Sequence, residues 1–225
     1  MRLEVVVTDT SEAVIAEKAG ASRVELVVEF ARGGLTPDDR LIAAVTDAVS
    51  IPVHVIIRPH DNGFVYSDAE QDVILEDARR MRELGASAVV FGALDTGGHI
   101  AGGLVRAVAA ASALPLTFHR AFDDVHTYSA AYALLSGISG VERVLTSGGA
   151  QTAWEGRARL RELCYGNTTP TVIAAGKIEA GNVLDLVEYT SVNEIHVGSG
   201  VRTGGRIDPR KIERLAALVL KGTVP

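Results

Sequence analysis

The chain has 225 residues, 47% of them hydrophobic, and a formal net charge of −6. A negative net charge argues against a general nucleic-acid binder, which would carry a basic surface. The single cysteine excludes an internal disulfide framework, and no apolar run approaches the ~18 residues of a membrane span. We therefore expect a cytoplasmic protein with neither nucleic acid nor membrane as a partner.

Eight short apolar runs alternate with longer amphipathic segments along the chain. The runs are centred on Val5, Val24, Val55, Val90, Phe118, Val144, Ile173 and Ile195. Several of the segments between them begin with helix signals. Asp9 is suited to an N-cap, Thr36 precedes Pro37 as an N-cap before the first helical residue, and Asp208 precedes the last amphipathic segment.

This alternation of β and α units implies parallel strands joined by right-handed crossovers. Eight units leave about 28 residues for each, which is sufficient for a closed barrel. A partial repeat supports this count, because the segment 19–24 returns in similar form at 84–89. We predict an α/β protein, a single-domain (β/α)8 TIM barrel over residues 1–225, with an open doubly wound sheet as the alternative.

Polar residues stand at the ends of several predicted strands, where a closed barrel places its active site. The candidate catalytic residues are Glu25, Arg58, His119, Arg120 and Asp123. Side-chain alternation also turns three further residues toward the barrel interior, Glu4, His54 and His196. The sequence leaves open whether these three belong to the site or to a charge-paired network in the barrel core.

Small residues follow the last three predicted strands, and barrels commonly hold a phosphate or another anion there. The candidate anion-binding residues are Ser147, Gly148, Gly176, Lys177 and Gly198. Local spacing indicates no metal site, so any metal ligands are unknown from the residues alone.

Several motifs, taken in order, resemble the CutC family, usually described as copper-homeostasis proteins. They are RVEL at 23–26, GGLTP at 33–37, IPVH at 51–54, IRP at 57–59, YSD at 66–68, TFHRAFD at 117–123 and LTSG at 145–148. The resemblance covers roughly Leu3 to Val197 and implies a TIM barrel with a role in copper homeostasis and copper as its ligand.

This chain departs from the family pattern at the residues expected to hold copper. Family members often carry a cysteine after the Glu-Leu pair, where this sequence has Val27. Copper(I) prefers thiolate and thioether ligands, and the one cysteine, Cys164, falls in a predicted helix. The resemblance therefore supports family membership more strongly than a copper site.

Two functions follow from these observations. One is a CutC-like role in copper homeostasis, with copper bound at the C-terminal mouth of the barrel. The alternative is an isomerase- or lyase-type enzyme acting on a small anionic or phosphorylated metabolite, with Arg58 and Arg120 clamping the anion. In that enzyme Glu25 or His119 would transfer a proton, while Asp123 orients its neighbour.

Other assignments use the same residues differently. Glu25, His119 and His196 could serve as ligands for zinc or manganese, although they lie on separate strands. A binding scaffold without catalysis is a third class of function. The expected partners are a small anionic molecule or a metal ion, together with further copies of the chain in a homodimer or higher homo-oligomer.

Overall fold

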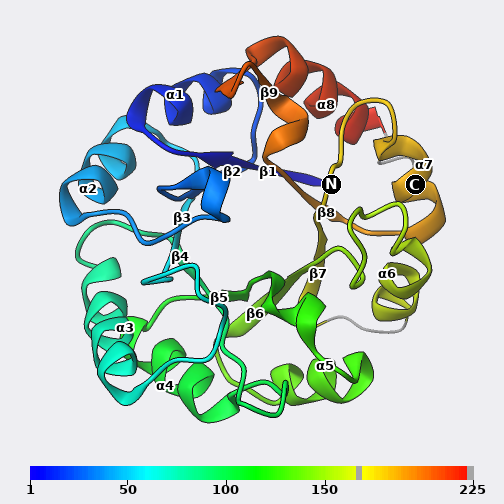
Figure 1. Ribbon diagram of the computed structural model, residues 1–225. Coiled ribbons are helices and arrows are strands. Elements are labelled where there is room, and N and C mark those ends of the chain that lie inside the picture. Colours follow the sequence, from blue (N-terminus) through cyan, green and yellow to red (C-terminus); the bar gives the residue numbers. More distant parts are fainter. Residues whose placement is uncertain (166–168, 222–225) are drawn as a thin grey trace.

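The computed structural model describes residues 1–165 and 169–221. At its centre is a closed barrel of parallel strands arranged in sequence order, with the helices on the outside (Figure 1). The strands are β1 (Arg2–Val7), β2 (Arg23–Leu26), β3 (Val53–Ile56), β4 (Ala88–Phe91), β5 (Leu116–Phe118), β6 (Val141–Thr146), β7 (Thr171–Ala174) and β8 (Glu194–Val197). Each predicted apolar run lies in one of these strands, so the predicted TIM barrel is confirmed and the open sheet is excluded.

Helices connect the strands and surround the barrel (Figure 1). They are α1 (Thr10–Lys18), α2 (Asp39–Ala48), α3 (Asp68–Met81), α4 (Gly102–Ser112), α5 (Tyr128–Ser136), α6 (Arg157–Cys164), α7 (Val183–Thr190) and α8 (Pro209–Lys221). Short 3-10 turns are η1 (Phe30–Arg32), η2 (Arg120–Asp124) and η3 (Ser199–Val201), and β9 (Arg202–Thr203) pairs with β10 (Arg206–Ile207) outside the barrel. Within the described ranges, no helix combines the length and hydropathy needed to cross a membrane.

Helix capping follows the sequence signals with one correction. Asp9 caps α1 as predicted, since its carboxylate accepts a hydrogen bond from the amide of Glu12 at 2.8 Å. In α2 the prediction was wrong, because Asp38 rather than Thr36 is the N-cap. The Thr36 hydroxyl instead accepts a hydrogen bond from the amide of Arg58 at 2.8 Å, which ties the loop after β2 to the end of β3.

The outer and inner faces of the barrel strands have different chemical surroundings. Outward-facing strand residues such as Val5, Leu26 and Val55 are fully buried in one continuous apolar core beneath the helices. Inside the barrel are two small apolar clusters, Val6, Val27, Ile56 and Val90 on one side and Leu145, Ile173 and Ala175 on the other. Burial between strands and helices therefore supplies most of the hydrophobic stabilisation, and polar side chains can occupy the barrel interior.

Candidate functional site at the mouth of the barrel

A charged network centred on Glu4 lies inside the barrel below the mouth. Arg23 donates its Nε hydrogen to Glu4 Oε2, and His54 Nδ1 lies 3.3 Å from the same oxygen. His196 Nδ1 lies 2.7 Å from Glu4 Oε1. Burial by itself would raise the pKa of Glu4, but Arg23 and the two histidines hold it well below its usual value. Glu4 is therefore the ionised centre of this network.

Two further charged residues balance the network. Arg23 Nη2 lies 2.6 Å from Glu194 Oε2, and Arg143 Nε lies 3.3 Å from the same oxygen. Two carboxylates thus face two guanidinium groups, as buried charges require. This arrangement answers what the sequence left open, because Glu4 and His54 belong to the core network.

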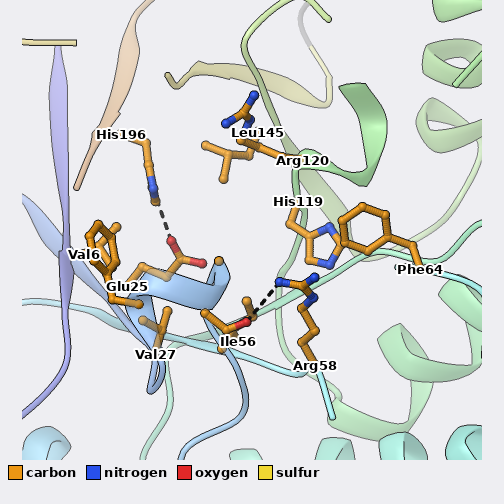
Figure 2. Close-up of a pocket in the computed structure, with 13 residues that line it drawn as sticks. Val6, Glu25, Val27, Ile56, Arg58, Phe64, His119, Arg120, Leu145 and His196 are labelled. Carbon is orange, nitrogen blue, oxygen red and sulfur yellow. Dashed lines mark hydrogen bonds and ion pairs between the residues drawn. The ribbon is translucent and has the colours of Figure 1, made fainter. Parts of the chain in front are cut away.

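Above this network, at the C-terminal ends of the strands, a cavity of about 680 Å³ including its open mouth enters the barrel (Figure 2). Its apolar wall includes Val6, Val27, Ile56 and Leu145. Its polar lining consists of Glu25, Arg58, His119, Arg120 and His196. Four of the five candidate catalytic residues therefore meet in one cavity, and His196 connects that cavity to the charged network.

Glu25 is an acid with few partners. It is 4% exposed, and its carboxylate lies 3.3 Å from His196 Nδ1 without a hydrogen bond to any described residue. Burial, reinforced by the negative charge of Glu4, raises the pKa of Glu25 to about 7. Burial alone would lower the pKa of His196, but the two carboxylates raise it. Glu25 can therefore both take up and release a proton near neutral pH.

Arg58 is a buried cation without a carboxylate partner. It is 8% exposed, and its Nη1 donates to the carbonyl oxygens of Arg32 and Gly34, each at 3.3 Å. Its guanidinium lies 5.0 Å from the ring centroid of Phe64. Within the described ranges it forms no ion pair, and its buried Nε has no hydrogen-bond acceptor. This contrasts with Arg23, whose charge is balanced, and leaves Arg58 able to bind an anion.

His119 is an uncharged hydrogen-bond donor. Its Nδ1 accepts a hydrogen bond from the amide of Ala121 at 3.1 Å, so the neutral ring carries its proton on Nε2. Burial, followed by the positive charge of Arg58, lowers the pKa of His119 to about 3. Nε2 is buried, and no described residue accepts its proton. The ring rests against Gly92, where a Cβ would lie only 2.5 Å from Nδ1.

Arg120 and Asp123 form a pair at the rim. Arg120 Nε donates to Asp123 Oδ2 at 2.7 Å, and its Nη2 donates to Ser147 Oγ at 2.9 Å. Asp123 Oδ1 also accepts from the amides of Ser147 at 3.0 Å and Gly149 at 3.1 Å. The amides after β6, which the sequence suggested for an external anion, therefore contact a carboxylate of the chain itself. Arg120 is correspondingly less available than Arg58.

The remaining candidate anion-binding residues also lie outside the cavity lining. Gly148 donates its amide to the threonine hydroxyl two residues earlier, at 2.9 Å. Gly176 accepts a backbone hydrogen bond at 2.9 Å, and Lys177 is exposed. Gly198 packs beneath Phe30, whose ring would lie 2.8 Å from a Cβ there. Anion binding by these residues stays a prediction.

Two aromatic residues that the sequence did not single out shape the mouth. Phe64 contacts both Arg58 and His119, with 4.9 Å between its ring centroid and that of His119. Phe30 covers part of the barrel interior, and the guanidinium of Arg202 lies 4.6 Å from its ring centroid. Both follow strand ends in loops that are otherwise polar and rich in glycine, which is the signal that could have identified them.

Glu4, Glu25 and His196 offer ligand atoms within 4.8 Å of one another, close enough to surround a metal ion. The electrostatics do not fit such an ion. His196 Nδ1 faces two carboxylates and so carries a proton, which a cation would have to displace while lying next to Arg23. His119, proposed from sequence as a metal ligand, is not part of this cluster.

The sulfur atoms do not form a copper(I) site either. Burial raises the pKa of the Cys164 thiol to about 11, so the thiol stays protonated on α6. Met81 lies in the apolar core on α3, and Met1 packs against that core. None of these three side chains is among the described residues that line the mouth cavity.

Comparisons with known proteins place the chain in a family. Residues 1–201 match the model of the CutC family. The mouse copper homeostasis protein cutC homolog is 40% identical over 196 residues, covering 86% of this chain and 72% of the mouse protein. A CutC family protein from Sodalis glossinidius is 38% identical over 201 residues, covering 88% of this chain and 79% of its own length.

Solved structures agree with this result. A CutC structure from Streptococcus agalactiae superposes with a TM-score of 0.84 at 29% identity, covering 90% of this chain and all of that one. TrpF from Jonesia denitrificans, with a TM-score of 0.68 at 20% identity over the whole of this chain and 99% of its own, shares the fold alone. Together with the family match and the mouse and bacterial relatives, these findings show that the chain belongs to the CutC family.

Proposed function

We propose that this protein serves copper homeostasis, the role named for its mouse relative, by binding a small organic anion at the barrel mouth. The ligand has a negatively charged group that meets Arg58 and an apolar body that contacts Val27 and Ile56. On this proposal the protein acts on a metabolite and does not carry copper(I) on sulfur ligands. Glu25 supplies acid–base chemistry at the bound ligand.

Arg58 carries this proposal. A buried guanidinium normally has a carboxylate partner, as Arg23 has in the core network. Arg58 has none among the described residues, and its buried Nε, which has no described hydrogen-bond acceptor, belongs to a side chain that lines a largely apolar cavity. A ligand carboxylate or phosphate would supply the missing negative charge through charge-assisted hydrogen bonds.

Isothermal titration with 4-methyl-2-oxopentanoate should show binding that depends on Arg58. This acid combines a carboxylate with a branched apolar body, and the neutral ketone 4-methyl-2-pentanone is its matched control. We expect Arg58→Met to raise the Kd of the acid by at least about tenfold, because charge-assisted hydrogen bonds are lost. Arg58→Lys keeps the positive charge but lacks the paired N–H donors of the guanidinium group. Its Kd for the acid should therefore lie between those of wild type and Arg58→Met.

Arg32→Met is the control variant, since this exposed side chain pairs with Asp61 at the same rim, with 2.7 Å between Nη2 and Oδ1. It should bind the acid as wild type does. Inorganic phosphate, titrated in parallel, tests whether the group at Arg58 is a phosphate or a carboxylate. Equal binding of the acid and the ketone, or unchanged binding of the acid by Arg58→Met, would refute the anion site. Arg58 would then only stabilise the β2–α2 loop through its hydrogen bonds to backbone carbonyls.

Copper(I) should not remain on the purified protein in the presence of a competing chelator. The thiol of Cys164 is protonated and away from the mouth, and the residues that line the mouth offer none of the sulfur ligands that copper(I) prefers. Untagged protein titrated under reducing conditions and analysed for metal content provides the measurement. Retention of one equivalent that disappears in Cys164→Ser or His119→Asn would instead establish direct copper binding.

A further inference from the structure

Two hydrogen-bond donors without acceptors lie on the same side of the mouth. His119 Nε2 and Arg58 Nε are both buried, and neither has an acceptor among the described residues. Both side chains contact Phe64, at 4.9 Å between ring centroids for His119 and 5.0 Å from the guanidinium for Arg58. Figure 2 shows His119 beside Arg58. Two unsatisfied donors so close together call for acceptor oxygens from a ligand.

Glu25 lies on the opposite side of the cavity, next to His196 (Figure 2). Among the described residues its carboxylate has no hydrogen-bond donor that would hold it in one protonation state, and the walls between it and Arg58 include Val27 and Ile56. A buried carboxylate whose charge is stabilised mainly by one neighbouring imidazole is a strong base toward a bound ligand, because little water reaches it. The ligand would therefore lie between a base on one side and two oxygen-binding donors on the other.

Resting on the proposed function, we infer that the mouth catalyses proton transfer at the carbon next to the carbonyl group of a 2-oxo acid. Arg58 binds the carboxylate, His119 donates its Nε2 hydrogen bond to the carbonyl oxygen, and Glu25 is the base. Enzymes that enolise carbonyl compounds use this pairing of a carboxylate base with an uncharged imidazole. The pKa of His119 of about 3 keeps the imidazole in that uncharged form.

The step balances without a further reactant. Glu25 takes a proton from carbon 3, the electrons of the C–H bond form a double bond between carbons 2 and 3, and the carbonyl electrons move to oxygen. His119 stabilises the resulting enolate through its hydrogen bond. Protonated Glu25 then returns a proton to carbon 3, or to another carbon if the substrate isomerises. His196, at 3.3 Å from Glu25, can exchange protons with it between turnovers.

Solvent exchange tests this chemistry. With 4-methyl-2-oxopentanoate in D2O, proton NMR should show loss of the signal from the carbon-3 protons, at a rate proportional to the concentration of wild-type protein. Glu25→Gln should slow exchange by at least about 100-fold, the usual range for removing a general base, while the acid still binds. His119→Asn should lower kcat more than it changes KM, because asparagine can keep the hydrogen bond from the Ala121 amide but lacks the Nε2 donor.

Arg32→Met again serves as the control and should exchange at the wild-type rate. Wild-type protein that binds the acid through Arg58 without accelerating exchange would overturn this inference and leave the proposed anion site intact. Exchange that survives in Glu25→Gln would overturn it as well. Exchange that needs Glu25 and His119 but not Arg58 would refute the anion site and, with it, the part of the inference in which Arg58 binds the carboxylate. Protein that neither binds the acid nor exchanges its protons would overturn both.

Discussion

Replacing Arg23 by methionine should lower the free energy of unfolding by about 3–5 kcal/mol, the usual cost of removing one partner of a buried ion pair. Arg23 is 2% exposed, and its guanidinium contacts Glu4 and, at 2.6 Å, Glu194. Methionine fills part of the volume but leaves two carboxylates buried without their shared cation. Urea unfolding at neutral pH measures the loss.

Arg32→Met is the matched surface variant, and it should lower the free energy of unfolding far less than Arg23→Met, because the Arg32–Asp61 pair is exposed. The effect of Arg23 should also depend on pH. The pKa of Glu4 lies below its ordinary value of 4.5, so its stabilising effect is complete above that value and is lost as pH falls toward the folded-state pKa. Equal losses in both variants, or an Arg23 effect unchanged by acidification, would contradict this account of the network.

The barrel was predictable because its signals are local. A parallel strand covered on both sides is apolar throughout, and residues 88–91 show this pattern directly. The helix signals at Asp9 and Asp208 depend on the residues just after them, so they too could be interpreted from sequence. Thr36 failed as an N-cap because its hydroxyl contacts the amide of Arg58, a residue on the next strand.

The identities of the site residues were predictable, but their partners were not. Glu4 lies in register with Arg23 of β2 and with His196 of β8, a contact that exists only because the barrel closes. Sequence alternation turned Glu4 and His196 inward but could not say which side chains would meet them. For the same reason it could not show that Arg23 is balanced by two carboxylates while Arg58 forms no ion pair with any described residue.

Loop conformation limited the remaining predictions. The amides after β6 were expected to hold a ligand, but η2 bends so that the carboxylate of Asp123 reaches the amides of Ser147 and Gly149. Phe64 contacts Arg58 and His119 only because the loop after β3 folds back over the mouth. Such contacts depend on the three-dimensional path of a loop, which periodicity does not encode.

The barrel interior therefore has two layers with different electrostatic requirements. In the lower layer Glu4 and Glu194 are matched by Arg23 and Arg143, and this layer needs no ligand. In the upper layer no described carboxylate forms an ion pair with Arg58. An unmatched charge lowers stability, and functional sites commonly accept that cost. The distinction predicts opposite stability effects for substitutions in the two layers.

Glu25→Gln should accordingly stabilise the protein at about pH 8, by about 3 kcal/mol. The folded-state pKa of Glu25, about 7, lies above its ordinary value of 4.5. A carboxyl group with a raised folded-state pKa favours the folded state while it is protonated, and stability falls as pH rises from about 4.5 to about 7. Glutamine has nearly the same shape as the protonated acid and never ionises, so it avoids this loss.

The pH dependence of the stability difference distinguishes this explanation from a purely structural role for Glu25. Urea unfolding of wild type and Glu25→Gln should give nearly equal stabilities at about pH 4.5, with the gap widening through about pH 7 and then becoming constant. A variant that is less stable than wild type at every pH would make Glu25 a structural partner of His196, like the acids of the lower layer. If Glu25→Gln is more stable than wild type and has also lost proton exchange, the ionisable side chain of Glu25 serves catalysis and lowers the stability of the fold.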